Sequence, residues 1–168
     1  MQKKKDSILI VDDEKINRRI LRRILSNDYT ILEAENGRQG VEVLNRESDS
    51  IMAIVLDLMM PVMDGWEFLR SYQLNENYRR VPILVATSAG DQESEKRCLE
   101  LGAWDFVSKP YDADVLRFRL KNAIERSQRN LMRELHYLAE HDPLTGIYNK
   151  NKFFLRTREM LEIGRAHV

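Results

Sequence analysis

The sequence contains one cysteine, Cys98, which excludes an internal disulfide and fits a reducing compartment. It also lacks an apolar run long enough to span a membrane. The basic N-terminus MQKKKD precedes an apolar run, but that run is too short for a signal peptide. We therefore expect a cytoplasmic protein with no membrane partner.

An excess of either charge is absent from the chain as a whole, since 27 Lys and Arg residues balance 27 Asp and Glu residues. Residues 1–114 hold 16 basic and 21 acidic residues, whereas residues 115–161 hold 10 and 5. The acidic part suits a small divalent cation. The basic charges lie among apolar helical positions, as on a solvated helix face, so we expect no nucleic-acid partner. A solvated face is also expected for Arg18, Arg19, Arg22 and Arg23.

One stretch, residues 51–65, organises the prediction of the fold. It reads IMAIVLDLMMPVMDG, in which a continuous apolar run leads directly into Asp57 and turn signals follow at Pro61 and Gly65. Such a run predicts a strand buried on both faces, and Pro and Gly mark the loop after it. Asp57 is therefore expected where a buried strand ends, although a turn residue or a helix cap would also explain it.

Similar short apolar runs alternate with amphipathic helical patterns along the chain. Five repeats predict an α/β domain with a parallel sheet and helices on both faces. The first, third and fourth strands look the most buried, which favours the doubly wound strand order 2-1-3-4-5. An extended C-terminal helix is expected from Asp112, because no helix breaker occurs before Pro143. The expected strands cover residues 7–11, 29–34, 51–56, 83–86 and 104–107.

Chemically active side chains follow three of these strands. Asp12 and Asp13 come after the first, Asp57 after the third and Lys109 after the fifth. Ligands of open parallel sheets bind at the carboxyl ends of the strands. Magnesium takes oxygen ligands and keeps several waters. The three carboxylates, with a backbone carbonyl near Met59, therefore predict a Mg2+ site.

Phosphoryl transfer fits the same residues. A carboxylate such as Asp57 can attack phosphorus, and the transfer depends mainly on charge neutralisation and alignment. The metal, Lys109 and the hydroxyl of Thr87 would then share the phosphoryl oxygens. The X–Pro bond at Lys109–Pro110 allows a cis peptide, which would turn the lysine toward the site. Taken singly, Lys109 would be a surface lysine and Thr87 a strand-end residue.

These residues lie in four motifs that closely resemble the receiver domain of two-component response regulators: VDDEKINRRIL, VLDLMMPVMDG, LVATSA and GAWDFVSKPYD. We assign residues 1–119 to this domain. The resemblance implies a flavodoxin-like (βα)5 fold with Asp57 as the phosphoacceptor and Lys109 as the lysine that pairs with the phosphate. It also implies that Asp12 and Asp13 are the acidic pair for the metal.

The same resemblance implies a partner and a switch. The phosphoryl donor would be a sensor histidine kinase or a phosphotransfer protein. Thr87 would be the switch hydroxyl and Phe106 the aromatic residue that rotates when Thr87 moves. The face formed by the fourth helix, the fifth strand and the fifth helix would change as a result.

The expected C-terminal helix carries apolar residues at a spacing of seven. This spacing predicts a helical linker over residues 120–140 that forms a coiled coil between two copies of the chain. The alternative is a single amphipathic helix that lies on its own domain. The residues concerned are Ile124, Leu131 and Leu138, spaced by seven, with Leu120 and Leu135 beside them.

Residues 141–153, HDPLTGIYNKNKF, resemble the opening of the GGDEF diguanylate cyclase family, whose pattern runs D-x-L-T-G-L-x-N-R-R-x-F. The family's glycine-rich signature loop is absent. We therefore expect residues 141–161 to be an N-terminal fragment of a GGDEF-like domain. Residues 162–168, EIGRAHV, look like a translated sequencing adapter and are set aside as an artefact. The matching residues are Asp142, Leu144, Thr145, Gly146, Asn149 and Phe153, whereas Ile147, Lys150 and Asn151 depart from the pattern.

Four functions fit these motifs to different degrees. We expect a phosphoaccepting signalling module that controls cyclic di-GMP synthesis through a cyclase output missing from this chain. The chain itself is then expected to have no enzyme activity apart from slow self-dephosphorylation. The alternative is a response regulator with a DNA-binding output lost by truncation, against which the LTG motif argues. A haloacid dehalogenase-like hydrolase would need a second aspartate where this chain has Met59. A scaffold that never takes phosphate is disfavoured, because every chemical position is filled.

Two positions predict a long-lived phosphorylated state. Met59 and Ala89 lie two residues beyond Asp57 and Thr87, and neither side chain can hold an attacking water by a strong hydrogen bond. Phosphate should therefore leave Asp57 slowly. The double substitution Met59→Asn with Ala89→Glu supplies polar groups at both positions, so this variant should not lose phosphate more slowly than the parent. Measuring phosphate release from both proteins tests this, and slower release from the variant contradicts it.

Overall fold

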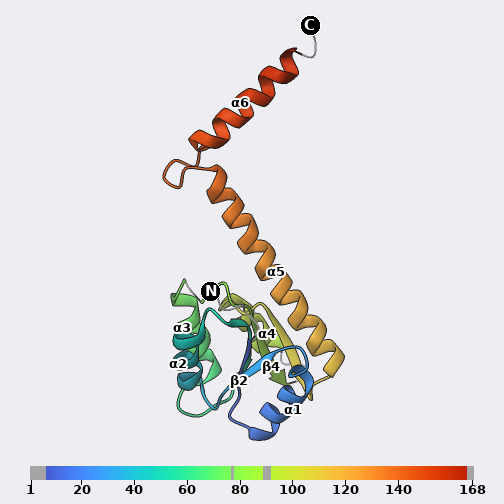
Figure 1. Ribbon diagram of the computed structural model, residues 1–168. Coiled ribbons are helices and arrows are strands. Elements are labelled where there is room, and N and C mark those ends of the chain that lie inside the picture. Colours follow the sequence, from blue (N-terminus) through green and yellow to red (C-terminus); the bar gives the residue numbers. More distant parts are fainter. Residues whose placement is uncertain (1–6, 77, 89–91, 166–168) are drawn as a thin grey trace. The chain divides into compact units, whose positions relative to one another are not determined.

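The computed structural model describes residues 7–76, 78–88 and 92–165, and the chain forms two compact units, residues 1–127 and 128–168. The first unit is a five-stranded sheet with helices on both faces (Figure 1). Its strands are β1 (Ser7–Val11), β2 (Thr30–Ala34), β3 (Ile51–Asp57), β4 (Ile83–Ser88) and β5 (Asp105–Lys109). The helices of the described residues are α1 (Lys15–Leu25), α2 (Gly37–Glu47), α3 (Gly65–Leu74), α4 (Gln92–Glu100), α5 (Ala113–Glu140) and α6 (Lys150–Arg165).

The strands are parallel and lie in the order β2-β1-β3-β4-β5. The flavodoxin-like fold and the predicted strand order are therefore confirmed. The three inner strands, β1, β3 and β4, are apolar along nearly their whole length and are buried between two layers of helices. β5 ends two residues later than the sequence predicted, because its pairing with β4 continues to Lys109.

Each face of the sheet packs against its own set of helices. On one face the core joins the sheet to Leu44 of α2, Phe68 of α3 and Cys98 of α4. On the other face it joins the sheet to Leu21 of α1 and Leu120 of α5. Fully burying one such leucine or phenylalanine contributes about 1.5–3 kcal/mol, so the two cores together hold the strands in a single register.

The loop after β3 is held close to Asp57 by Gly65. The N–H of Gly65 donates to the carbonyl of Leu58 at 2.9 Å, and Asp64 caps the N-terminus of α3 in a reciprocal pair with Glu67. A Cβ atom at Gly65 would lie 2.4 Å from the carbonyl oxygen of Asp57. Glycine is therefore the only residue that allows this close approach of α3 to the end of β3.

The extended C-terminal helix is confirmed as α5, which has 28 residues. Its first part packs on the sheet, and Leu120 and Ile124 are buried there. These two predicted seam positions therefore serve the domain's own core, as the alternative of an amphipathic helix on its own domain expected. Farther along α5, Leu135 and Leu138 expose about half of their surface (52% and 48%).

Several predictions about the C-terminal part stay predictions. The expected domain boundary after residue 119 lies inside α5. α6 extends into the segment 162–168, whose suggested origin the structure does not test, and residues 166–168 lie outside the described part of the chain. Among the helices that the structure describes, none combines the length and apolar character needed to cross a bilayer.

Candidate functional site

The register of the sheet brings the predicted site residues to one edge. Val11 of β1 pairs with Leu56 of β3, so the next residues along the two strands, Asp12 and Asp57, are neighbours. Lys109 is the last residue of β5, at the same carboxyl edge. This edge lies next to the point where the strand order reverses, which is where open α/β sheets bind ligands.

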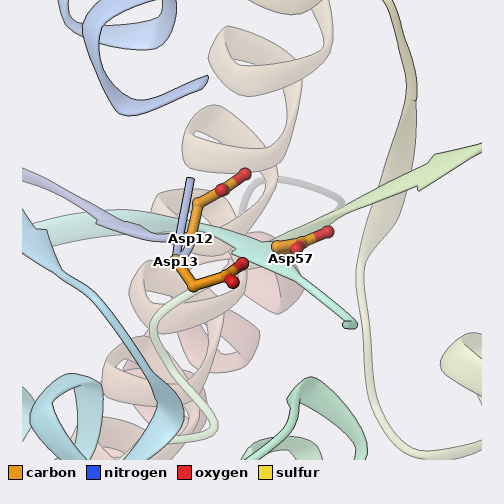
Figure 2. A group of neighbouring side chains, drawn as sticks. All are labelled: Asp12, Asp13 and Asp57. Carbon is orange, nitrogen blue, oxygen red and sulfur yellow. The ribbon is translucent and has the colours of Figure 1, made fainter. Parts of the chain in front are cut away.

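Asp12, Asp13 and Asp57 form an acidic cluster at this edge (Figure 2). One carboxylate oxygen from each residue lies within 4.8 Å of the other two. Asp12 and Asp57 are buried, with 1% and 7% of their surface exposed, whereas Asp13 is exposed and keeps the cluster in contact with solvent. A small divalent cation prefers oxygen donors of this kind and retains water on its open side. The three residues therefore fit Mg2+.

Lys109 bridges two of the three carboxylates. Its Nζ donates to Asp57 Oδ1 at 2.9 Å and to Asp12 Oδ2 at 3.2 Å. The other oxygen of Asp12 accepts from the backbone N–H of Glu14 at 2.9 Å. The peptide bond Lys109–Pro110 is cis, as predicted. Lys109 thus supplies one positive charge to a cluster of three negative charges.

The pKa values of the cluster reflect burial and excess negative charge. Burial raises the pKa of Asp57, and with the added charge of Asp12 it outweighs the hydrogen bond and charge of Lys109, which lower it. Burial alone lowers the pKa of Lys109, but its hydrogen bond to Asp57 and the charges of Asp57 and Asp12 raise it overall. Both shifts follow the direction expected where negative charge is in excess, and a bound cation would offset that excess.

Thr87 and Phe106 lie on the two strands beyond Asp57. Thr87 follows the β4 residue that pairs with Asp57 and is 3% exposed. Its Oγ1 atom is buried and has no hydrogen-bond partner among the described residues. Phe106 lies on β5 beneath the guanidinium group of Arg119, which is 5.5 Å from the ring centre. A cavity of about 230 Å³ borders Phe106 between β5 and the start of α5.

Two other predicted positions remain untested. Met59 lies in the loop after β3 with its side chain exposed, and the proposed role of its backbone carbonyl as a metal ligand stays a prediction. Ala89, which was paired with Met59 in the prediction of slow dephosphorylation, lies outside the described residues.

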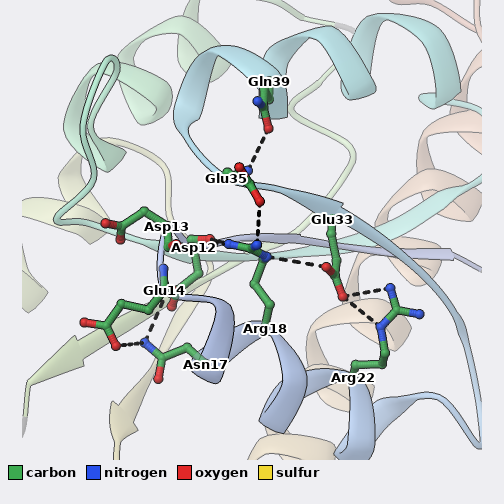
Figure 3. Close-up of polar contacts among 9 residues, drawn as sticks. All are labelled: Asp12, Asp13, Glu14, Asn17, Arg18, Arg22, Glu33, Glu35 and Gln39. Atoms are coloured by element: carbon green, nitrogen blue, oxygen red, sulfur yellow. Dashed lines mark hydrogen bonds and ion pairs between the residues drawn. The ribbon is translucent and has the colours of Figure 1, made fainter.

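The prediction of a solvated face was wrong for Arg18, which is 5% exposed. Arg18 Nη1 donates to the backbone carbonyls of Asp12 at 2.7 Å and Asp13 at 3.1 Å (Figure 3). A signal for this burial does exist in the sequence. Arg18 lies three and seven residues before Leu21 and Leu25, which places all three on one face of the helix.

Tyr111 is a second residue that the sequence did not reveal. Its hydroxyl is buried and has no hydrogen-bond partner within the described part of the chain. Burial raises its pKa, and the charges of Asp12, Asp57 and Glu14 raise it further. No sequence pattern distinguishes such a hydroxyl from one that reaches solvent.

Together, the fold and the site define a class of protein. It is a doubly wound α/β domain with an acidic cluster that fits a divalent cation, and with a lysine beside that cluster, near the point where the strand order reverses. The model of the response regulator receiver domain family matches residues 8–121. The chain therefore belongs to the response regulator receiver domain family. Members of this family take part in two-component signalling, accept phosphoryl groups from sensor histidine kinases and bind Mg2+ in an acidic pocket.

Individual relatives agree with this assignment. "Histidine kinase P4" of Formosa agariphila is 34% identical over 128 residues, which are 76% of this chain and 9% of that protein. "Probable transcriptional regulator ycf27" of Pyropia yezoensis is 34% identical over 130 residues, 77% of this chain and 51% of that protein. The chain thus spans about half of the length of one of these curated relatives and less than a tenth of the length of the other.

A solved structure also resembles the domain. The receiver domain of sensor histidine kinase PA1611 from Pseudomonas aeruginosa has a magnesium ion coordinated in its active-site cleft. It is 30% identical to this chain, with a TM-score of 0.65, and the match covers 71% of this chain and 98% of that structure.

The raised pKa of Asp57 predicts how stability depends on pH. Because the folded-state pKa lies above the ordinary value of 3.8, the folded protein binds more protons than the unfolded chain between the two values. Its unfolding free energy therefore falls as the pH rises through this interval. Asp57→Asn cannot ionise, so in the absence of Mg2+ its stability relative to the parent should increase as the pH rises above 3.8.

Urea unfolding at a series of pH values, without Mg2+, measures this difference. Asp49→Asn is the matched control, because Asp49 is exposed and lies outside the cluster. The relative stability of this control should change little with pH. A difference between Asp57→Asn and the parent that stays constant, or that moves in favour of the parent, contradicts the prediction.

Proposed function

We propose that Asp57 accepts a phosphoryl group from a sensor histidine kinase, or from a phosphotransfer protein, in a reaction that requires Mg2+. The observation that carries this proposal is the contact of Lys109 with Asp57 and Asp12 inside the acidic cluster. A lysine ammonium that already touches the accepting carboxylate is well placed to pair with a phosphoryl oxygen added to it. Membership of the receiver family supports the same assignment.

The chemistry follows from this arrangement. A carboxylate oxygen of Asp57 attacks the phosphorus of a phosphohistidine. As the new P–O bond forms, the P–N bond breaks and its electron pair returns to the ring nitrogen, so the histidine leaves neutral when its other ring nitrogen carries a proton. Lys109 meanwhile holds Asp57 in place and offsets charge on the phosphoryl oxygens. Bound by Asp12, Asp13 and Asp57, Mg2+ would supply further positive charge to those oxygens.

Thr87 and Phe106 would convert this chemistry into a change of shape. The phosphoryl group brings negative charge and strong acceptor oxygens. The hydroxyl of Thr87 is buried and has no hydrogen-bond partner among the described residues, so it is available to donate to one of these oxygens. Movement of Thr87 toward Asp57 would make room for the Phe106 ring, which already borders a cavity. Phosphorylation would thereby favour one of two arrangements of the α4, β5 and α5 face.

We further propose that the output under this control is a GGDEF diguanylate cyclase that synthesises cyclic di-GMP, and that this chain itself is a phosphoacceptor rather than an enzyme with turnover. The residues that match the cyclase pattern form a compact turn, which supports this. Asp142 Oδ1 accepts from the N–H of Leu144 and from the N–H and hydroxyl of Thr145. Gly146 has a positive φ of 68°, and Asn149 Oδ1 accepts from the N–H of Lys152.

A DNA-binding output is the second candidate, and the ycf27 relative named as a transcriptional regulator favours it. That match spans 130 residues of this chain, whereas the cyclase-like turn accounts for residues beyond the receiver domain. We therefore prefer the cyclase output. The coding sequence downstream of residue 161 distinguishes the two, because only one of them would continue into a glycine-rich GGDEF loop.

We also propose that the remaining apolar positions of α5 join two copies of the chain. Leu131, Leu135 and Leu138 are the seam residues left once the first part of the helix has packed on the sheet. Leu135→Lys places a charge in this seam and should shift the chain toward monomer. Sedimentation velocity over a range of protein concentrations measures the shift.

Met132→Lys is the matched control for the seam. Met132 is also exposed, but it lies one position beyond Leu131 and outside the seven-residue repeat. This control should associate like the parent. A parent that stays monomeric, or a Leu135→Lys variant that associates as strongly as the parent, contradicts the proposal.

The phosphoacceptor role has a direct test. The parent chain incubated with acetyl phosphate and Mg2+ should gain the mass of one phosphoryl group, because the P–O bond of acetyl phosphate can replace the donor P–N bond. Asp57→Ala should gain none, whereas Asp49→Ala, at an exposed aspartate away from the cluster, should gain it as the parent does. Intact-mass spectrometry, with EDTA added to a parallel sample, reads out all four reactions. Phosphorylation of Asp57→Ala, or of the parent in EDTA, to the level of the parent with Mg2+ contradicts the proposal.

A further inference from the structure

Arg18 is the most buried arginine of α1, and every part of its guanidinium group is engaged. Nη1 donates to the carbonyls of Asp12 at 2.7 Å and Asp13 at 3.1 Å. Nε donates to Glu33 at 3.4 Å, and Nη2 donates to Glu35 at 2.7 Å (Figure 3). A buried arginine of this kind is costly unless its partners are well placed, which they are here.

The two carbonyls belong to the residues that carry the acidic pair. A single nitrogen of Arg18 therefore fixes the backbone on which the Asp12 and Asp13 carboxylates are mounted. The hydrogen bonds described for Arg18 do not include the carboxylate of Asp12 or of Asp13. The side chain of Lys109 contacts the Asp12 carboxylate instead. Arg18 thus holds the acidic pair through its backbone carbonyls and leaves its carboxylates available to a metal ion.

The other arm of the guanidinium anchors this support to the sheet edge. Glu33 belongs to β2, and Glu35 is the first residue after the end of β2. The backbone N–H of Glu35 donates to the side chain of Gln39 in α2 at 2.9 Å. Arg22 also contacts Glu33, at 2.7 Å, which keeps that carboxylate in place. Arg18 therefore joins the loop after β1 to the end of β2, and the Glu35–Gln39 hydrogen bond continues this connection to α2.

We propose that Arg18 is a positioning residue that holds the Asp12–Asp13 backbone in the geometry needed to bind Mg2+, and so sets the Mg2+ dependence of phosphorylation at Asp57. This inference rests on the proposed function of the cluster. It is specific to arginine, because only a planar group with five N–H donors can reach two carbonyls and two carboxylates at once. A lysine has one nitrogen and can satisfy only part of this set.

The test compares the Mg2+ requirement of folded proteins that differ at this position. Outer-shell partners of metal ligands typically change affinity by about 10- to 100-fold, so Arg18→Met should raise the half-saturating Mg2+ concentration by about tenfold or more. Arg18→Lys should restore part of this loss. The rate of phosphorylation by acetyl phosphate as a function of Mg2+, and calorimetric titration with Mg2+ alone, give the two readouts on the full chain.

Arg22→Met is the matched control. Arg22 lies on the same helix and shares the partner Glu33, but its side chain is 53% exposed, and its described hydrogen bonds do not include the loop after β1. Its half-saturating Mg2+ concentration should stay within about twofold of the parent, below the effect of an outer-shell change. Thermal unfolding without Mg2+ reports separately on any loss of stability, which a merely structural role would produce without changing the Mg2+ requirement.

The outcomes separate this inference from the proposed function. A folded Arg18→Met whose half-saturating Mg2+ concentration equals that of the parent overturns the role of Arg18 and leaves the site of Asp57 intact. A parent that binds no Mg2+ overturns both. If Arg18→Met does not fold, Arg18→Lys decides: a raised Mg2+ requirement supports the inference, and a requirement equal to that of the parent overturns it.

Discussion

The site depends on one positively charged side chain, Lys109, which lies between two buried carboxylates on different strands. Asp12 and Asp57 are neighbours because β1 and β3 pair in register, and their mutual repulsion would be unfavourable in a buried setting without a positive charge. Lys109 supplies that charge from the end of β5, with its Nζ at 2.9 Å from Asp57 and 3.2 Å from Asp12. Since Asp13 adds a third negative charge, the lysine leaves the cluster short of positive charge. The negative charge that Lys109 does not offset therefore favours binding of a divalent cation.

Rigid parallel strands make this balance of charges workable. The carboxylates are attached to inner strands that are buried on both faces, so burial of apolar side chains fixes their backbone positions. The close approach of Gly65 to the carbonyl of Asp57 holds the start of α3 against the end of β3. Arg18 constrains the other loop by holding the carbonyls of Asp12 and Asp13. Stability of the fold and geometry of the site are thus supplied by the same elements.

The sequence predicted the parts of this arrangement that local patterns control. Continuous apolar runs gave the inner strands, and carboxylates at the ends of two of those runs gave the acidic cluster. The motifs GAWDFVSKPYD and LVATSA placed Lys109 and Thr87. The prediction was poorer where a charged side chain is buried by tertiary contacts: Arg18 follows a helical stripe that also contains Leu21, yet its charge suggested a solvated face.

The sequence indicated two uses of the C-terminal helix, but not how its apolar positions divide between them. A spacing of seven fits both a coiled coil and a helix that covers a sheet, because both bury one stripe of a helix. In the structure, Leu120 and Ile124 are used for the sheet. Sequence spacing cannot divide the helix between these uses, since the division depends on where the sheet ends.

The start of α5 is also joined by side-chain contacts to β5, the strand that carries Phe106. Arg119 lies over the Phe106 ring and donates to Asp105 at 2.6 Å, which ties the helix to β5. β5 pairs in turn with β4, where Thr87 lies opposite Ser108. A path of contacts alone does not establish coupling, because coupling needs an element with two arrangements that both sites favour differently. Phe106 borders a cavity, as do Ser108 and Arg119 on the same path. If phosphorylation of Asp57 moves the Phe106 ring as proposed, this cavity offers the volume for a second arrangement of the ring that leaves the sheet intact.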